Sequence, residues 1–140
     1  MAEITSSLEY YIEAVYSIFK TENKVKAVDV SRKLNVSRAS TTEALQKLEQ
    51  LGLINYGHYG AISLTDAGID KAKEVIKKHK TLSVFFEKIL GVEPELAENT
   101  ACKIEHVIDD DVVSILEKFN QFSYKNNLKK DFMEFIQNDK

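Results

Sequence analysis

The chain has 140 residues, of which 44% are hydrophobic and 29% are charged, and its formal net charge is −3. This length suits one compact domain or two small domains that share a core. The lone Cys excludes an internal disulfide, the N-terminus lacks the pattern of a signal peptide, and no apolar stretch approaches the ~18 residues of a membrane span. We therefore expect a cytoplasmic protein.

Charge is divided unevenly along the chain. Residues 1–80 hold 12 Lys or Arg and 10 Asp or Glu, whereas residues 81–140 hold 7 and 12. This asymmetry fits a first half that meets phosphates and a second half that meets cations. The small numbers of Gly (5) and Pro (1) favour a mostly helical chain.

The first half has the pattern of a helix-turn-helix. A first helix is predicted over residues 6–20, where Ser6 and Glu9 have the spacing of a capping box. Two further helices are predicted over residues 27–34 and 38–50, with Ser37 as the N-cap of the second. A short helix, a tight turn and a longer capped helix are typical of this motif.

After this motif the spacing of the hydrophobic residues changes from that of a helix to that of a β-strand. Residues 53–56 and 61–64 read as short strands around the turn Gly57–Gly60, which predicts a two-stranded β-wing. Thr65 can cap a long helix that runs to about Leu90. Beyond the chain breakers Gly91 and Pro94, the pattern predicts one helix over residues 95–119 and a short last helix over residues 128–137.

The second helix of a helix-turn-helix enters the major groove of DNA, and the residues near its N-terminus meet the bases. The side chains there are small, hydroxyl-bearing or cationic, so they can approach and bond bases or phosphates. The alternative is a helical hairpin used only for packing. The predicted DNA contacts are Lys26, Ser37, Arg38, Ala39, Ser40, Thr41, Thr42 and Lys47.

The segment "ACKIEHVIDDD", residues 101–111, concentrates metal-ligating side chains. On a continuous helix, Cys102, Glu105 and His106 stand at i, i+3 and i+4, so their heads can converge. Thiolate, carboxylate and imidazole all bind divalent transition metals. The alternative is a solvated acidic face with a buried Cys. The predicted core stripe beside these residues is Ala101, Ile104, Ile108, Val112, Ile115 and Phe119.

Two other helices offer further donors. His79 shares the apolar stripe of the long helix, where a lone His is commonly a hydrogen-bonded core residue. Glu13 lies on the first helix, where a Glu is ordinarily solvated. Each residue is a weak signal alone, and the combination favours a metal site.

From "SSLEYYIEAVY" through "LTDAG" to "ACKIEHV", residues 6–120 resemble the diphtheria-toxin-repressor family of metal-activated transcription repressors. The specific features are the Cys-x-x-Glu-His order, the spacing from His79 to Cys102, and the winged helix ahead of them. The resemblance implies a homodimer that binds palindromic operators when loaded with Fe²⁺ or Mn²⁺. It also implies the short form of the family, which has no SH3-like domain.

The resemblance also implies which residues bind the metal. The residues present here combine features of two branches of the family. Iron-responsive members have equivalents of Cys102, Glu105 and His106 as ligands and usually Met at the position of Tyr10. Manganese-responsive members have Asp at that position, Glu in place of Cys102, and a ligand equivalent to Glu13. Tyr10 therefore fits neither branch.

A second site of the iron-responsive branch includes the equivalent of His79. The other partners of that site fall on Ser83 and Glu98, of which only Glu98 is a good ligand. Because a thiolate suits Fe²⁺ better than Mn²⁺, we expect Fe²⁺, with Mn²⁺ as the alternative. At the positions of Ala39 and Glu43 iron-type repressors tend to have Pro and Gln, so the operator sequence does not carry over.

Together these patterns predict a mainly α protein. Residues 1–72 form a winged helix-turn-helix domain, and residues 73–140 form an all-helical domain for dimerisation and metal binding. A metal held by Glu13, His79 and the Cys102 cluster would fix the winged helix relative to the dimer core. The rivals are a metal-independent winged-helix regulator and a metalloenzyme; the sequence shows no nucleophile-plus-base pair, so we expect no enzyme. The apolar flank predicted for dimerisation is Phe85, Phe86, Ile89, Val112, Val113, Leu116 and Phe119.

Overall fold

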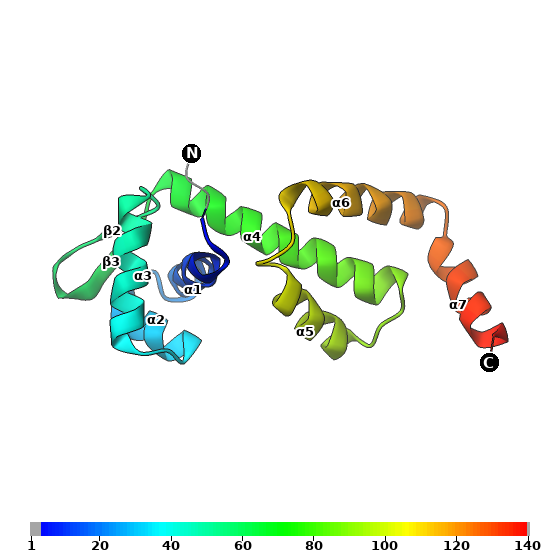
Figure 1. Ribbon diagram of the computed structural model, residues 1–140, viewed down its shortest axis with the longest axis horizontal. Helices are drawn as coiled ribbons and strands as arrows, with labels where there is room; N and C mark the ends of the chain where they lie inside the picture. Colours follow the sequence, from blue (N-terminus) through cyan, green and yellow to red (C-terminus); the bar gives the residue numbers. More distant parts are fainter. Residues whose placement is uncertain (1–3, 140) are drawn as a thin grey trace. The chain divides into compact units, whose positions relative to one another are not determined.

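The computed structural model describes residues 4–139, and it is mainly helical (Figure 1). The chain divides into two compact units, Met1–Ile76 (unit 1) and Lys77–Lys140 (unit 2). Unit 1 carries a small antiparallel sheet, and unit 2 is helical. The predicted class, a winged helix followed by a helical domain, is confirmed.

Unit 1 has the order of a winged helix-turn-helix. Helix α1 packs against α2 and α3, and a short strand precedes α2. The wing follows α3 as two strands joined by a 3-10 turn. The elements are α1 (Ser6–Glu22), β1 (Val25–Lys26), α2 (Ala27–Leu34), α3 (Arg38–Gln50), β2 (Ile54–Tyr56), η1 (His58–Gly60) and β3 (Ala61–Leu64).

The boundaries of these elements follow from local hydrogen bonds. The Ser37 side chain accepts from the Ser40 N–H at 3.1 Å and begins α3, as predicted. Helix α1 instead begins after Thr5, whose hydroxyl accepts from the Leu8 N–H at 3.2 Å, so the capping box expected at Ser6 is wrong. Thr65 caps α4 (Asp66–Val84), as predicted, by accepting from the Gly68 N–H at 3.0 Å.

The sheet has the strand order β1-β3-β2. The wing strands pair antiparallel with Ile54 opposite Leu64 and Tyr56 opposite Ile62, which confirms the two-stranded wing. Strand β1, which was not predicted, adds two residues to the other edge of β3. One apolar core supports both parts of the unit and includes Ile12, Val15, Val30, Leu45, Leu48, Ile54 and Ile62.

Unit 2 differs from the sequence prediction in its main helix. The single helix expected over residues 95–119 is wrong, because the chain forms α5 (Pro94–Ile104) and α6 (Asp110–Lys125) with a turn between them. Asp109 is the N-cap of α6, and two more acidic residues occupy the first turn, where they suit the positive end of the helix dipole. Helix α7 (Leu128–Asn138) follows.

This break also corrects the predicted core stripe. Ala101 is buried, but Val112, Ile115 and Phe119 are 50%, 68% and 41% exposed, and Val113 is the buried residue of the first turn of α6. The stripe required a continuous helical phase across residues 104–110. Once the helix is interrupted, the apolar residues beyond the turn are rotated away from the core.

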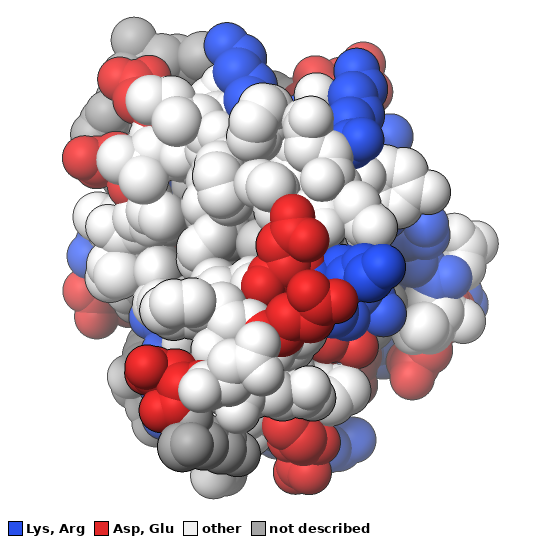
Figure 2. All heavy atoms as spheres, turned by 90° about the vertical axis from the view of Figure 1, so that its right-hand side faces the viewer, with Lys and Arg blue, Asp and Glu red and all other residues white. Residues whose placement is uncertain are grey.

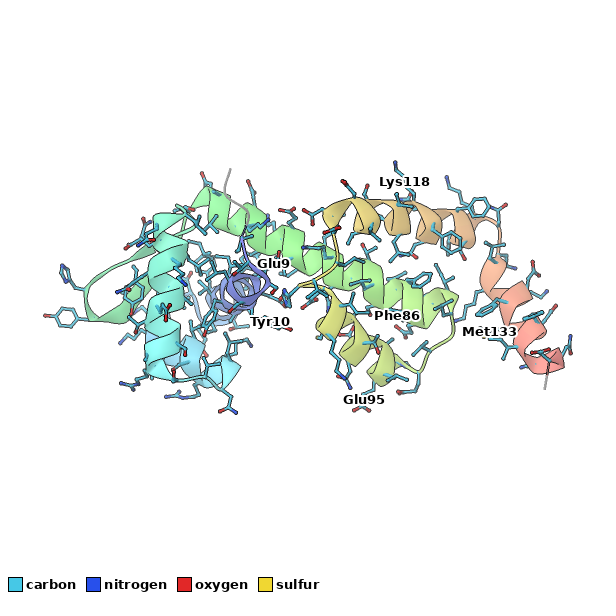
Figure 3. All side chains as sticks on the ribbon, viewed as in Figure 1. Glu9, Tyr10, Phe86, Glu95, Lys118 and Met133 are labelled. Atoms are coloured by element: carbon cyan, nitrogen blue, oxygen red, sulfur yellow. The ribbon has the colours of Figure 1, made fainter. Side chains whose placement is uncertain are left out.

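The end of the long helix is irregular. After α4 the chain continues as a π-helix, η2 (Phe85–Ile89), and then turns at Gly91, where φ is +74°. A Cβ atom at Gly91 would lie 2.7 Å from the sulfur of Met133. In Figure 3 the Met133 side chain of α7 points toward this turn, while Glu95 projects into solvent from α5. Glycine is therefore favoured here by its left-handed conformation, whereas the flexible end of Met133 could shift to admit a Cβ atom.

Unit 2 exposes many apolar side chains. Uncharged side chains cover much of the face drawn in Figure 2, and charged side chains of both signs gather near its centre. Phe119 forms ring contacts with Phe85 and Phe122, at centroid distances of 6.2 and 6.3 Å. Exposed patches of this kind mark interaction surfaces. The large apolar side chains exposed on α6 and α7 are Val112, Ile115, Phe119, Phe122, Tyr124, Phe132, Phe135 and Ile136.

Candidate metal centre and DNA-binding face

His79 of α4 lies between two carboxylates. Its Nδ1 is 2.7 Å from Glu105 Oε2, and its Nε2 is 2.7 Å from Glu98 Oε2. An ionised carboxylate only accepts hydrogen bonds, so an imidazole can donate to both partners only when it carries two protons and a positive charge. Both contacts are therefore favourable only when a positive charge lies between Glu105 and Glu98. That charge is either a proton on the ring or a metal ion bound in place of that proton.

A thiol joins this group from α5. Cys102 Sγ lies 3.8 Å from His79 Nδ1, and one ligand atom each of His79, Cys102 and Glu105 lie within 4.8 Å of one another. Cys102 is exposed, which contradicts the alternative of a buried thiol acting as a small apolar residue. Nitrogen, sulfur and oxygen donors thus face a common point.

Glu105 connects the cluster to a second imidazole. It is 2% exposed, and its Oε1 lies 2.9 Å from His106 Nε2, which is also buried. A buried carboxylate is costly unless a positive charge or several hydrogen bonds compensate it. His79 supplies part of that compensation through its contact with Glu105 Oε2, and a divalent ion would supply it more completely.

The end of α5 explains why these side chains meet. Pro94 stands in the first turn of the helix, and Glu93 caps it by accepting from the Leu96 N–H at 3.1 Å. Cys102 is in the last turn, and Glu105 is the C-cap residue. Glu105 and His106 therefore approach each other at a helix end, not on the continuous helix that the sequence analysis assumed.

The carboxylates around His79 shift the pKa of its imidazole, and the imidazole in turn shifts the pKa of Glu98. Burial lowers the pKa of His79, but the hydrogen bond that the ring donates to Glu98 and the charges of Glu105 and Glu98 outweigh it, so this pKa is raised. The pKa of Glu98 is lowered, first by the Ser83 hydroxyl, which donates to Glu98 Oε1 at 2.8 Å, and then by His79. Metal binding to His79 therefore competes with protonation of the ring.

The turn that carries Glu105 and His106 is held by an ion pair. Lys78 of α4 is 7% exposed, and its Nζ lies 3.3 Å from Asp110 Oδ1 at the start of α6. This pair links α4 to the residue that ends the turn. The backbone that positions these two candidate ligands thus connects to α5 on one side and to α6 on the other.

The donor set fits a divalent transition ion. Imidazole nitrogen, thiolate sulfur and carboxylate oxygen are ligands that Fe²⁺, Mn²⁺ and Zn²⁺ use in proteins, and the buried negative charge of Glu105 needs a cation nearby. Among the predicted ligands, the structure groups His79, Cys102, Glu105 and His106 in unit 2. Glu13 lies on α1, in unit 1.

One neighbour of the cluster was not among the predicted ligands. Glu98 contacts His79 directly and is held by Ser83. Spacing along the sequence gave no signal for this contact, because His79 and Glu98 lie on different helices. Helical spacing placed Glu98 on one polar stripe with Cys102, Glu105 and His106, and the family resemblance placed it near a metal.

The DNA-binding candidates lie at the start of α3 and beside the wing. Ala39 and Ser40 are exposed, and the Ser37 hydroxyl donates to Ser40 Oγ at 2.9 Å. Thr41 is buried, and its hydroxyl donates to the Ser37 carbonyl oxygen at 2.9 Å. Arg38 is exposed. The structure brings four of the predicted contacts together around one hollow: Lys26, Arg38, Thr41 and Thr42.

A basic residue further along α3 has an acidic partner. Lys47 Nζ lies 3.3 Å from Glu43 Oε1, and both side chains are more than half exposed. Exposed pairs of this kind contribute about 0–1 kcal/mol. The pair therefore leaves Lys47 able to exchange its partner for a phosphate.

Both parts of the chain match known domain families. Residues 3–62 match the iron dependent repressor, N-terminal DNA binding domain, and residues 65–130 match the iron dependent repressor, metal binding and dimerisation domain. An uncharacterised HTH-type transcriptional regulator of Methanocaldococcus jannaschii is 35% identical over 117 residues, which cover 83% of this chain and 94% of that protein.

Two further relatives extend the comparison. The HTH-type transcriptional regulator MntR of Listeria monocytogenes is 32% identical over 102 residues, which cover 73% of this chain and 71% of that protein. A solved manganese-dependent transcriptional repressor in complex with manganese shares the fold, with a TM-score of 0.72 and 23% identity over 82% of this chain. This chain spans 53% of the length of that solved chain.

A winged-helix unit followed by a helical unit with nitrogen, sulfur and oxygen donors defines a metal-dependent DNA-binding regulator. The chain belongs to the diphtheria-toxin-repressor family of metal-dependent transcriptional repressors. Operator DNA and a second copy of the chain are its partners, and a divalent metal is its cofactor. None of the helices in residues 4–139 has the length and apolar character to cross a membrane.

Proposed function

We propose that this repressor responds to Fe²⁺ and controls genes of metal homeostasis. The observation that supports it is the Cys102 thiol, which faces His79 at 3.8 Å beside the buried Glu105. A thiolate is a soft ligand that binds Fe²⁺ more strongly than Mn²⁺, whereas carboxylate and imidazole serve both ions. The thiol is therefore the part of the donor set that favours iron.

The proposed ligands are His79, Cys102, Glu105 and His106. When bound, the ion supplies positive charge that compensates the Glu105 carboxylate and replaces the proton shared by the imidazole and its neighbours. Cys102 and His79 lose their protons when the ion binds, so metal affinity is coupled to proton release. Glu13 stays a predicted ligand on the strength of the resemblance to manganese-responsive members, and replacing it by Gln tests that role.

Glu98 has a different proposed role. It accepts from His79 Nε2 and from Ser83, so it sets the orientation and the protonation of the imidazole. Carboxylates that hold a ligand histidine in this way typically change metal affinity by 10–100-fold when they are removed. Glu98→Gln should therefore weaken metal binding without abolishing it.

We propose that residues at the start of α3 recognise DNA and that residues beside the wing contribute further contacts. The exposed side chains there are Ser37, Arg38, Ala39 and Ser40, with Thr42 half-buried behind them. Thr41, which is buried, lines the hollow beside them. Lys26 and Lys47 are the proposed phosphate contacts. The domain limits that we propose are residues 1–72 for DNA binding and 73–140 for dimerisation and metal binding.

Metal and DNA are coupled by linkage. If metal loading raises the affinity for operator DNA by some factor, DNA raises the affinity for metal by the same factor. A coupling of about 1–3 kcal/mol is typical and suffices for a 5–150-fold response. We propose that this binding equilibrium is the whole function, with no catalytic step, and that it operates in the cytoplasm, where operator DNA is accessible.

Manganese is the second candidate ion. The predicted ligand Glu13 is typical of manganese-responsive members, and a manganese-dependent repressor shares the fold. A hard ion such as Mn²⁺ would rely on the carboxylates and imidazoles and would gain little from Cys102. The two candidates therefore differ in how strongly they depend on the thiol.

An anaerobic titration distinguishes them. Operator affinity is measured against Fe²⁺, Mn²⁺, Zn²⁺ and Co²⁺ for the wild type and for Cys102→Ala, with bound metal counted per chain. Under the iron proposal Fe²⁺ is the tighter activator and the variant loses that preference. If Mn²⁺ is tighter in the wild type and Cys102→Ala leaves its binding unchanged, manganese is the physiological ion. The solvent-exposed Cys102 requires anaerobic handling because thiolates oxidise.

The exposed apolar side chains of α6 and α7 are proposed as part of the dimer contact. Of the flank expected from sequence, Val112 and Phe119 are exposed, whereas Ile89 and Val113 are buried within the chain. Phe122 and Phe135, which the prediction omitted, are 54% and 64% exposed. Aromatic side chains are enriched in the buried centres of such interfaces, so replacing Phe122 by Asp should weaken the dimer.

A further inference from the structure

Unit 1 has a hollow of about 270 Å³ between the wing and the beginnings of α2 and α3. Pockets for drug-sized ligands have volumes of roughly 300–1,000 Å³, so this hollow suits a smaller group. Part of its wall comes from predicted DNA contacts, Lys26, Arg38 and Thr42, and part from two wing tyrosines, Tyr56 and Tyr59. The wing residues were not among the contacts predicted from sequence.

The walls favour an anion. Lys26 and Arg38 are cationic, and Thr42, Tyr56 and Tyr59 bring hydroxyl donors. Among the described residues that line the hollow there is no Asp or Glu. Two carboxylates hold the backbone of lining residues, since Glu49 accepts from the Tyr56 N–H at 2.7 Å and Asp29 accepts from the Lys26 N–H at 3.1 Å.

Tyr59 is the unusual residue of the wing. Its side chain is fully exposed, at 100%, and its backbone is in the left-handed region, with φ 62° and ψ 22°. Bulky residues rarely adopt this conformation, and strained backbone of this kind is found mainly at ligand clamps and functional sites. A fully exposed aromatic side chain on such a backbone makes Tyr59 a candidate for contact with a ligand.

We propose that this hollow seats one backbone phosphate of the operator, held by Lys26 and Arg38, with Tyr59 against the adjoining sugar. The proposal rests on the DNA-binding function and adds the wing to the recognition helix as a contact. It also assigns Arg38 to phosphate, where sequence alone left phosphate and guanine open. Arg38 then contributes affinity for every DNA sequence and no preference among bases.

The test combines protein variants with neutral phosphate analogues. An operator is first selected from random duplexes with the metal-loaded wild-type protein. Single methylphosphonates, which remove one backbone charge each, are then placed along it, and the affinity is measured for the wild type, Lys26→Ala, Arg38→Ala and Tyr59→Ala. Lys47→Ala serves as the matched control, since Lys47 is an exposed cation of α3 that does not line the hollow.

A shared phosphate gives a distinct pattern. Each of Lys26→Ala and Arg38→Ala should weaken binding about tenfold, and one methylphosphonate position should cost the wild type a similar factor. At that position the methylphosphonate should reduce the affinity of Lys26→Ala and Arg38→Ala little further. It should reduce the affinity of Lys47→Ala by the same factor as for the wild type. Tyr59→Ala should weaken binding severalfold on operator and random duplex alike. The slope of log affinity against log salt should fall by about one for Lys26→Ala and stay unchanged for Tyr59→Ala.

Other patterns overturn the proposal. If the losses of Lys26→Ala and Arg38→Ala multiply with that of the methylphosphonate at every position, the two residues do not share a phosphate. A change of base preference in Arg38→Ala means that Arg38 reads a base, and wild-type affinity in Tyr59→Ala removes the wing from the contact. Loss of the repressor function itself is a separate outcome, seen as wild-type protein that selects no operator.

Discussion

Replacing Glu105 by Gln removes the charge at the centre of the metal site with little change of shape. Glu105 is 2% exposed, and its two oxygens lie 2.7 Å from His79 Nδ1 and 2.9 Å from His106 Nε2. A neutral amide ligates metal poorly, and it cannot compensate the charge of an imidazolium. We expect the variant to fold and to lose most of its response to metal.

The magnitude follows from linkage. At a free metal concentration of about 100 times Kd, binding stabilises the folded wild-type protein by about 2.7 kcal/mol. Loss of a ligand that also orients an imidazole should weaken binding at least about 100-fold, so the same metal concentration stabilises the variant by only about 0.4 kcal/mol. For a chain of this size 1 kcal/mol shifts Tm by roughly 3–4 °C, so the metal-induced shift should fall from about 10 °C to about 1 °C.

The assay is thermal unfolding with and without metal, in parallel with a chelated sample. Glu95→Gln is the matched control, because Glu95 is an exposed Glu on the first turn of the same helix and projects into solvent (Figure 3). The control should keep the wild-type shift. A full metal-induced shift in Glu105→Gln, or an equal loss in Glu95→Gln, would refute the assignment of Glu105 as a ligand.

The remaining predictions concern ion choice and the fold of unit 1. Cys102→Asp should raise affinity for Mn²⁺ relative to Fe²⁺ at least tenfold, measured by anaerobic competition between the two ions; an unchanged ratio would remove the thiol from the site. Gly68→Ala should destabilise unit 1 by about 3 kcal/mol or more in urea unfolding, because its Cβ would lie 1.9 Å from the Leu53 carbonyl oxygen. Gly57→Ala should change stability by less than about 1 kcal/mol, because its Cβ would lie at an ordinary contact distance of 3.7 Å from the Ala61 carbonyl oxygen. Leu45→Ala should cost about 2–5 kcal/mol in the same assay, since Leu45 is fully buried in the core; a smaller loss would mean that the cavity collapses.

Unit 1 was predicted well because its signals are local. The helices at residues 27–34 and 38–50 have the predicted limits, and the turn between them is set by Ser37 as an N-cap. The wing strands were predicted from alternation around a glycine turn. Strand β1 was missed because two residues carry no periodic pattern, and only their pairing with β3 defines them.

Unit 2 was predicted less well because the turn between α5 and α6 contains no Gly or Pro to mark the end of a helix. The segment between α5 and α6 continues an apolar pattern through Ile104 and Ile108, which favoured one helix. The signal for the break was the run Asp109–Asp111, which is better suited to a helix start than to a helix interior. The π-helix at Phe85–Ile89 was missed because one extra residue per turn barely disturbs the periodicity.

The candidate metal site was also predicted only in part, because sequence spacing reports neighbours within one helix and not contacts between helices. Cys102, Glu105 and His106 were predicted from their spacing, although the helix ends at Ile104 and the convergence occurs in the turn beyond it. The contacts of His79 with Glu98 and Glu105 join helices that are far apart in sequence. Such contacts depend on how α4 and α5 pack, which no pattern within one helix reports.

The most direct test of metal-linked DNA binding is a chelation and reloading experiment on one sample. Anisotropy of the labelled operator is followed as the wild-type protein is stripped with a chelator and then loaded anaerobically with Fe²⁺. We predict that affinity falls at least tenfold on chelation and returns fully on loading, with a saturable number of ions per chain. Operator affinity that is the same in chelated and loaded protein would contradict metal activation.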